Sequence, residues 1–306
     1  MGPTGVGKSS FIHSIIPPEV SDVIRVGHRL QSETSQVQPI YLDNNKTIKL
    51  VDTPGFDDSR ENLTDVDVLE MIASFIMIEW KRGACELVGL IYIHRISDTR
   101  VGGTSQRNLR MFRKLCGDES MKNVVIVTTM WDKVTTEEGG NREQELMSSD
   151  NLFKPLLNKG AIMMRHDRTP ESATNVVKYL LNRNATITQI VREIAYERKA
   201  LVDTKAGEEL QAEIRHLMKK HAEEIRQLEE EINAAAQEED KTTVDGLVAE
   251  KQKLENDQER LMGELGKLKL PKKIIASTYA PICTFAKILD EPSNPLFSSP
   301  NCRSCQ

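Results

Sequence analysis

The pattern of apolar and polar positions divides the chain into three zones. In residues 1–183, short β-branched runs alternate with helix-like patterns, which is typical of an α/β domain with a mostly parallel sheet. The runs predict strands at 39–42, 47–51, 87–93, 123–129 and 161–164. Apolar residues spaced three and four apart predict helices directly after residue 8 and at 63–80, 104–115, 142–157 and 171–181.

Residues 184–270 form the second zone, which is highly charged and contains no proline. Leucine recurs every seven residues at Leu247, Leu254, Leu261 and Leu268, which is the spacing of a coiled coil. We therefore expect a coiled coil or a helical hairpin, with a turn at 240–243. A single solvated helix held by Glu and Lys pairs stays open as an alternative, because many other seam positions are polar.

The third zone, residues 271–306, contains Pro, Ser and a modest apolar stretch and predicts a poorly ordered tail. Cys302 and Cys305 have the spacing of half a zinc site, but the sequence offers no second half. We therefore expect no zinc site there.

Composition narrows the classes of protein. The formal net charge of -5 gives no basic field that would indicate nucleic acid. The 5 cysteines are scattered and odd in number, which favours reduced thiols and a cytoplasmic protein. No segment of the sequence is long and apolar enough to predict a transmembrane helix, whereas peripheral membrane contact stays open.

The most specific motif is Gly2-Pro3-Thr4-Gly5-Val6-Gly7-Lys8-Ser9, a complete G-x-x-x-x-G-K-[ST] phosphate loop. Its glycines let successive backbone N–H groups point at phosphate oxygens, and the following helix adds partial positive charge. Lys8 can reach the β- and γ-phosphates, and the Ser9 hydroxyl can bind Mg²⁺. A Gly-rich surface turn, the bland alternative, has no need of Lys-Ser followed by an apolar helix.

The position of this motif adds an expectation. A phosphate loop normally follows a buried strand, and here it begins one residue after Met1. We therefore expect about five to ten apolar residues ahead of Met1, in a strand that lies inside the sheet and pairs with its neighbours.

A second nucleotide motif follows the strand predicted at 47–51. Asp52-Thr53-Pro54-Gly55 places a carboxylate at the end of that strand, where it can hold Mg²⁺ directly or through water. The backbone N–H of Gly55 can then approach the γ-phosphate. Taken alone, the motif would be an ordinary turn, but its order after the phosphate loop indicates a nucleoside triphosphatase.

Two weaker signals complete the predicted site. The polar segment at 30–38 offers Thr34, with Ser35 as the rival, as the residue whose hydroxyl meets Mg²⁺. The strand at 123–129 ends in Thr129-Met130-Trp131-Asp132, where a GTPase has Asn-Lys-x-Asp. Asp132 can accept hydrogen bonds from N1–H and the exocyclic amino group of guanine, so guanine is favoured over adenine.

The departures from Asn-Lys-x-Asp and the next loop also bear on the base. Thr129 replaces the Asn that braces the loop, and Met130 replaces the Lys whose stem covers the base. The loop Arg165-His166-Asp167, after the last strand, is placed to approach the base from its other side.

Together, these motifs resemble those of the septin-like GTPases related to translation factors. The resemblance is greatest to the immune-associated (IAN) and chloroplast-import-receptor branch and to fungal AIG-type G-domain proteins, and it covers about the first 180 residues. It implies a three-layer α/β/α G domain in residues 1–183, GTP or GDP and Mg²⁺ as ligands, slow hydrolysis, and dimerisation across the nucleotide face. Work at membranes is frequent in such proteins.

Hydrolysis depends on a residue that this chain lacks. Phe56 follows Gly55, where Ras-like enzymes have a Gln that orients the attacking water, so an isolated domain should be slow. Relatives with this substitution complete the site with another group or with a partner subunit. Within the chain, Asp57 and Asp58 could position water, and Arg95 could act in trans as an arginine finger. Alternatively, His94 and Arg95 only hydrogen-bond the neighbouring switch.

The predicted site is therefore as follows. The nucleotide contacts are Gly2, Thr4, Gly5, Val6, Gly7, Lys8, Ser9, Ser10, Thr129, Asp132 and Arg165, the Mg²⁺ ligands are Ser9, Thr34 and Asp52, and the catalytic residues are Lys8, Thr34, Gly55 and Arg95.

Three functions compete at this stage. The first is a GTP-dependent switch that self-associates through the nucleotide face while the helical zone relays the state or recruits a coiled-coil partner. The second is a non-catalytic GTP-binding scaffold, which Phe56 keeps open. The third is an ATPase or nucleotide kinase, against which Asp132 and the Asp52–Gly55 motif stand.

Overall fold

The structure is a computed structural model that describes residues 1–15, 38–42, 48–56, 63–83, 87–237 and 241–269. Met1–Lys272 form one compact unit. The predictions for Thr34, Ser35, Asp57, Asp58 and the tail at 271–306 fall outside the described residues. No helix in the described ranges combines the length and apolar character that a bilayer crossing requires.

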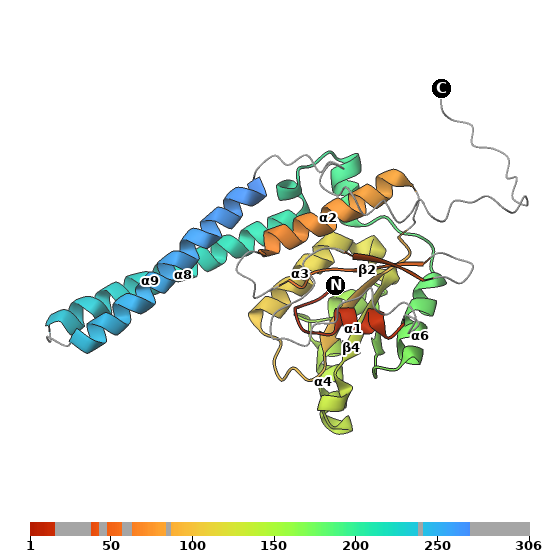
Figure 1. Ribbon diagram of the computed structural model, residues 1–306, viewed down its shortest axis with the longest axis horizontal. Coiled ribbons are helices and arrows are strands. Elements are labelled where there is room, and N and C mark those ends of the chain that lie inside the picture. The colour runs from red at the N-terminus through yellow and green to blue at the C-terminus, as the bar shows by residue number, and fades with distance from the viewer. Residues whose placement is uncertain (16–37, 43–47, 57–62, 84–86, 238–240, 270–306) are drawn as a thin grey trace, which may run out of the picture. The chain divides into compact units, whose positions relative to one another are not determined.

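The sheet is present in two described parts (Figure 1). Strands β3 (Leu90–Arg95), β4 (Val124–Thr129) and β5 (Ile162–Arg165) are parallel and lie in that order. Strands β1 (Gln38–Leu42) and β2 (Ile48–Asp52) form an antiparallel pair. All five strands were predicted from the sequence to within about three residues at either end.

Helices cover both faces of the parallel strands. On one face, Ile93, Val125 and Val127 pack with residues of α1 (Lys8–His13) and α6 (Pro170–Leu181). On the other face, the Tyr92 ring contacts Phe112 of α3 (Gly103–Cys116) and Phe153, at centroid distances of 4.9 and 5.7 Å. All of β4 is buried, as expected for a strand with helices on both sides. The predicted α/β/α fold is confirmed.

The helix predicted at 142–157 was wrong in extent. The structure has α4 (Thr136–Ser148) and a separate short α5 (Lys154–Leu157). Thr135 and Glu138 form a capping box, which satisfies backbone N–H groups and starts α4 earlier than the apolar spacing suggested. The same device, Thr64 with Asp67, starts α2 (Asp65–Arg82).

The segment between α6 and residue 204, which the sequence places mostly in the helical zone, consists of short helices and turns. It forms α7 (Gln189–Val191), the π-helix η4 (Arg192–Tyr196) and the 3₁₀ turn η5 (Leu201–Asp203), while η2 (Asp118–Asn123) and η3 (Trp131–Lys133) flank β4. The buried Glu193 accepts a hydrogen bond from the Lys205 backbone N–H, at 3.1 Å. This bond ties the short turns to the start of the next long helix.

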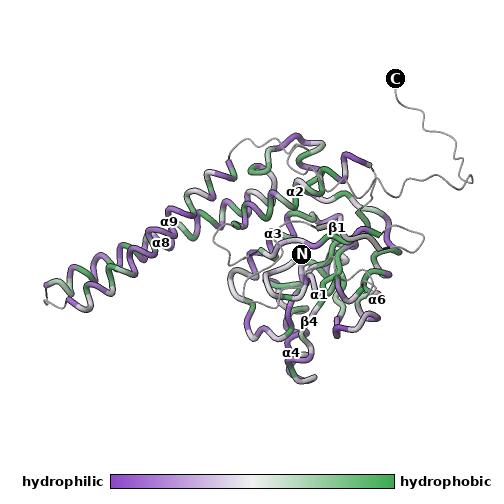
Figure 2. The backbone as a smooth tube through the Cα atoms, viewed as in Figure 1, coloured by the Kyte–Doolittle hydropathy of each residue, from purple (hydrophilic) through white to green (hydrophobic). Residues whose placement is uncertain are grey.

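The second zone contains a helical hairpin. Helices α8 (Lys205–Gln237) and α9 (Lys241–Lys269) lie side by side and antiparallel (Figure 1). Apolar residues recur along both helices among polar ones (Figure 2), and Leu228 and Leu261 are buried. Lys251 of α9 pairs with Glu229 of α8 at 2.7 Å. Of the alternatives, the structure shows the hairpin: α8 ends at Gln237, and α9 begins at Lys241, within the predicted 240–243.

Charged contacts dock this hairpin on α2 and α3. Arg110 of α3 pairs with Glu209 and Glu213 of α8, at 2.7 and 3.1 Å. Lys267, in the last turn of α9, lies 3.5 Å from Asp67 in the first turn of α2. The hairpin therefore contacts the sheet domain through the start of α8 and the end of α9.

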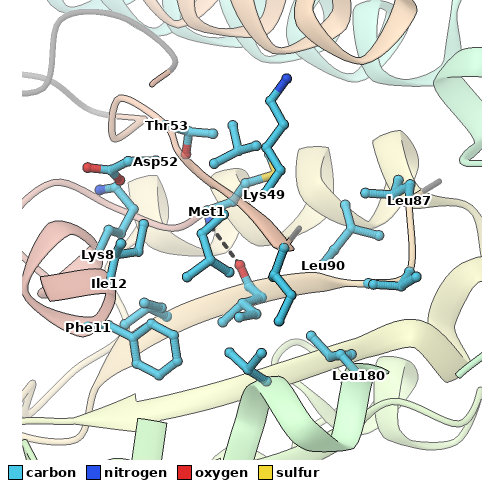
Figure 3. A pocket seen from close by; sticks show the side chains of 18 of the residues that line it. Met1, Lys8, Phe11, Ile12, Lys49, Asp52, Thr53, Leu87, Leu90 and Leu180 are labelled. Carbon is cyan, nitrogen blue, oxygen red and sulfur yellow. Dashed lines mark hydrogen bonds between the residues drawn. The ribbon is translucent and has the colours of Figure 1, made fainter. Parts of the chain in front are cut away.

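The chain before α1 lies against the open edge of β3. The Met1 amino group donates to the Ile91 carbonyl at 2.6 Å, the Ile93 N–H donates to the Met1 carbonyl at 2.9 Å, and Pro3 makes a parallel bridge to Phe56. A cavity of about 200 Å³ lies here, with Lys8 and Asp52 at one end and Leu87 and Leu180 at the other (Figure 3). A strand ahead of Met1 stays a prediction.

The docked hairpin predicts a pH dependence at Glu264 of α9. Burial raises the pKa of this carboxyl above 4.5, and the Asp65 and Asp67 carboxylates add to the rise while Arg260 and Arg107 oppose it. A raised pKa favours the protonated form in the folded state. The contribution of Glu264 to stability is therefore present below pH 4.5 and is lost as the pH rises through the folded-state pKa.

We expect Glu264→Gln, which stays neutral, to raise the Tm at pH 7.5 by about 2 °C. The gain should vanish at pH 4, where both side chains are neutral. Calorimetry at the two pH values tests this, with the exposed Glu259→Gln of the same helix as the control. An equal gain at both pH values would contradict the assignment.

Candidate functional site

The loop at residues 2–9 turns tightly against the end of β3. Gly2 has φ 137°, and a Cβ built on it would lie 2.4 Å from the Ile93 carbonyl oxygen, so only glycine fits. Gly7 caps α1 with φ 92°. The Lys8 side chain is buried and its Nζ donates to the Pro3 carbonyl at 2.7 Å, which holds the ammonium group across the loop.

The structure brings the two strongest sequence motifs together. The Ser9 hydroxyl donates to Asp52 Oδ2 at 2.6 Å, although the residues are 43 positions apart in the chain. Gly55 approaches the loop so closely that a Cβ on it would lie 2.3 Å from Thr4 Oγ1. A hydroxyl and a carboxylate beside a buried lysine are the oxygen donors and the cation that a magnesium-bound polyphosphate needs.

Two buried hydroxyls at this place support a polar ligand. Thr4 Oγ1 and Thr53 Oγ1 are buried and have no hydrogen-bond partner among the described residues. A buried polar atom without a partner costs free energy, and a bound ligand or water removes that cost. The residues present therefore fit a nucleotide phosphate with Mg²⁺.

Thr129 braces the loop from β4. Its buried hydroxyl contacts the Val6 carbonyl at 2.8 Å and the His94 carbonyl at 3.3 Å. The Thr129 carbonyl accepts the Ile96 N–H at 2.9 Å. The end of β4, the end of β3 and the phosphate loop are thereby fixed to one another.

The region predicted to recognise the base lies at the ends of β4 and β5. Thr128 joins the two loops, since its carbonyl accepts both Trp131 Nε1, at 3.1 Å, and the His166 N–H, at 2.9 Å. Asp132 is 45% exposed and lies 3.3 Å from Arg168 Nη1. Asp132, the residue predicted to bind the base, is thus accessible and has a cation beside it.

The side chains of the predicted loop 165–167 have other partners. Arg165 stacks on the Trp131 ring at 4.2 Å and pairs with Glu143 through two of its nitrogens, which raises its pKa. Burial lowers the pKa of His166, whose ring lies edge-on to Phe11 at 5.1 Å. Asp167 accepts the Thr169 N–H at 3.0 Å, and the Thr169 hydroxyl lowers its pKa.

Sequence reasoning passed over Arg168, which lies one residue beyond the segment chosen. No signal in the sequence marks it, because a single arginine in a polar loop has no spacing that reveals its partner. The parallel pairing of β4 with β5 brings it to Asp132.

The residues considered for hydrolysis differ in how far they are buried. Phe56 is fully buried. His94 is buried beside Phe153, and burial lowers its pKa to about 4, so it is neutral at pH 7. Arg95 is 39% exposed, pairs with Asp98 at 3.0 Å, and its Nη1 lies 3.7 Å from a Cβ built on Gly5. Arg95 is therefore the exposed cation at the rim of the phosphate loop.

Comparison with known proteins agrees with this geometry. Residues 1–129 match the family model described as "50S ribosome-binding GTPase". No curated protein gives a significant match. This match covers less than half of the chain, and the fold and the joined motifs of the structure are consistent with it.

Solved structures of Toc33 from Arabidopsis thaliana have a similar chain path. A dimerization-deficient mutant has 16% identity and a TM-score of 0.46, with 61% of this chain and 85% of that chain covered. The complex with GDP and Mg²⁺ has 17% identity and a TM-score of 0.45, with 60% and 84% covered. The complex with Mg²⁺ and GMPPNP has 18% identity and a TM-score of 0.45, with the same shares covered.

The bracing by Thr129 can be tested without nucleotide. Thr129→Val keeps the shape of the side chain and leaves the Val6 carbonyl without its donor. We expect the free energy of unfolding to fall by about 1–3 kcal/mol. Thr4→Val is the matched control, because the Thr4 hydroxyl is buried without a partner among the described residues. Urea denaturation of both variants measures the difference, and equal losses would contradict the bracing role.

Proposed function

We propose that this chain binds GTP with Mg²⁺, hydrolyses it slowly, and acts as a molecular switch that self-associates through its nucleotide face. The hydrogen bond between Ser9 and Asp52 carries the proposal, since it joins the phosphate loop to the second motif at one point. Bound Mg²⁺ would supply positive charge to the β- and γ-phosphates. Ser9 and Asp52 would hold it, with Thr34 as a further ligand.

Lys8 and the backbone of the loop would bind the phosphates. A buried ammonium group close to the loop strengthens the attraction for phosphate, because little water screens it. Lys8 Nζ donates to the Pro3 carbonyl, and an ammonium group has three hydrogens to donate, so phosphate would not have to displace that oxygen. Gly55 of the second motif lies close to the loop, and its N–H would complete the cradle.

Guanine preference rests on Asp132. A carboxylate accepts hydrogen bonds only, and it complements the N1–H and exocyclic amino group of guanine. Adenine presents an acceptor at N1, which an ionised carboxylate repels. The exposed Asp132 at the end of β4 therefore favours GTP over ATP.

Self-association would explain how hydrolysis proceeds with Phe56 in the core. Because Phe56 is fully buried, it cannot orient water. Arg95 lies at the rim of the phosphate loop and is partly exposed, so a second copy of the chain could reach it or be reached by it. Its ion pair with Asp98 would have to open or turn for Arg95 to meet a phosphate in a partner.

In this proposal, the hairpin would relay the nucleotide state through its contacts with α2 and α3. Helix α2 begins ten residues after Gly55, and its first turn bears Asp65 and Asp67. Arg107 of α3 holds Asp65 at 2.5 Å, and Lys267 of α9 lies 3.5 Å from Asp67. A shift of α2 that follows the γ-phosphate would therefore change contacts of both α3 and α9.

A non-catalytic scaffold is the second candidate, and the buried Phe56 favours it. One assay separates the candidates: single-turnover hydrolysis of GTP and ATP at several protein concentrations, with binding of each nucleotide measured in parallel. A rate that rises with protein concentration for GTP alone supports the switch. Tight binding without turnover supports the scaffold, and a preference for ATP would refute both.

Arg95 gives the sharper prediction. We expect Arg95→Ala to lower the GTP hydrolysis rate at high protein concentration at least tenfold, since an arginine supplied to a transferring phosphoryl group is worth about 10³-fold or more. GDP affinity should change little. Arg100→Ala, an exposed arginine five residues on, is the control. An unchanged rate in Arg95→Ala would remove Arg95 from the mechanism.

A further inference from the structure

One departure from the usual base-binding motif, Met130, lies next to an arginine from another loop. Met130 stands where a GTPase of the usual pattern has a lysine, so the loop after β4 lacks its cation at that position. Arg168, from the loop after β5, reaches this place. Its Nη2 lies 3.1 Å from Met130 Sδ, and its Nη1 lies 3.3 Å from Asp132 Oδ2.

The backbone around Arg168 is built to present it. Asp167 accepts the backbone N–H and hydroxyl of Thr169, at 3.0 and 2.6 Å, and the Thr169 hydroxyl caps α6. Arg168, between these two residues, has φ 69°, and Met130 across from it has φ 61°. Left-handed backbone is unfavourable for a non-glycine residue, because its Cβ lies too close to the following carbonyl oxygen. Such strain is retained where the surrounding structure and function require it.

The chemistry of the two side chains suits a purine. A guanidinium group is planar, weakly hydrated and stacks on aromatic faces, and the Met130 thioether is polarizable and packs on rings. Arg168 and Lys133 both approach Asp132 through Oδ2, at 3.3 and 3.9 Å. A carboxylate has about four acceptor positions, so it can serve Arg168 and the base together.

We propose that Arg168 replaces the lysine missing at Met130 and covers the ring of a guanine nucleotide whose edge is held by Asp132. This inference rests on the proposed GTP-binding function and assigns a base-covering residue to it. Arg168 comes from the opposite loop to the residue that it replaces. The cation is therefore restored in space although the motif is broken in sequence.

Calorimetric titration of the full chain with GDP and IDP, in buffer with Mg²⁺, tests the assignment. IDP lacks the exocyclic amino group but keeps the same ring system. We expect Arg168→Ala to lower the affinity for GDP and IDP alike, by about tenfold. The variant loses the guanidinium group that stacks on the face of the base, but it keeps the hydrogen bonds of Asp132 to the edge of the base. Arg168→Lys should restore part of the loss. Asp132→Asn should instead reduce the preference for GDP over IDP.

Lys133→Ala is the matched control. It removes a neighbouring exposed cation that approaches the same Asp132 oxygen but has no planar group to stack. We expect Lys133→Ala to change the affinity for GDP and IDP less than twofold. If Lys133→Ala and Arg168→Ala lose the same affinity, Arg168 contributes only its charge, and the proposal is overturned. Tm values of the nucleotide-free variants show that each is folded.

The remaining outcomes are distinct. If the wild-type chain binds GDP and Arg168→Ala binds it equally well, the assignment of Arg168 is refuted while GTP binding stands. If Arg168→Ala binds GDP more tightly, Arg168 competes with the base for Asp132, and the proposal is also refuted. If the wild-type chain binds neither nucleotide, the proposed function itself fails.

Discussion

The contact between Ser9 and Asp52 is the constraint on which the site depends. These residues belong to different layers, one to the first turn of α1 and the other to the end of β2, and their oxygens are 2.6 Å apart. That distance fixes the phosphate loop and α1 relative to the β1–β2 pair. Glycines at positions 2 and 55 permit it, because any Cβ there would collide with backbone or side chain.

Thr129 extends this constraint to the rest of the parallel sheet. A threonine hydroxyl has one hydrogen, and here it lies between two carbonyl oxygens, those of Val6 and His94. The usual asparagine of the motif would offer more donors. The substitution therefore keeps the bracing function with a smaller side chain. It also keeps the loop and the ends of β3 and β4 together without nucleotide.

The strands, and the meeting of the phosphate loop with Asp52, were predicted from the sequence because both depend on short-range patterns. Buried β-branched runs identify strands, and the spacing of Gly2, Lys8 and Ser9 is fixed by phosphate geometry. The start of α4 was missed because its first turn is polar and shows no apolar spacing. The Thr135–Glu138 capping box stabilises the helix there nevertheless. The turns after α6 were missed because the buried Glu193 acts through tertiary bonds that no periodicity records.

The contact of Arg168 with Met130 and Asp132 could not be predicted from the sequence. A sequence motif requires that the cooperating residues follow one another, and here the cation and the carboxylate come from different loops. Met130 alone suggests a degenerate site, and Arg168 alone suggests nothing. Only the pairing of β4 with β5, which sets Thr128 beside Arg165, brings them within contact. A broken motif in one loop can therefore be complete in space, and its chemistry must be judged from the neighbours that the sheet provides.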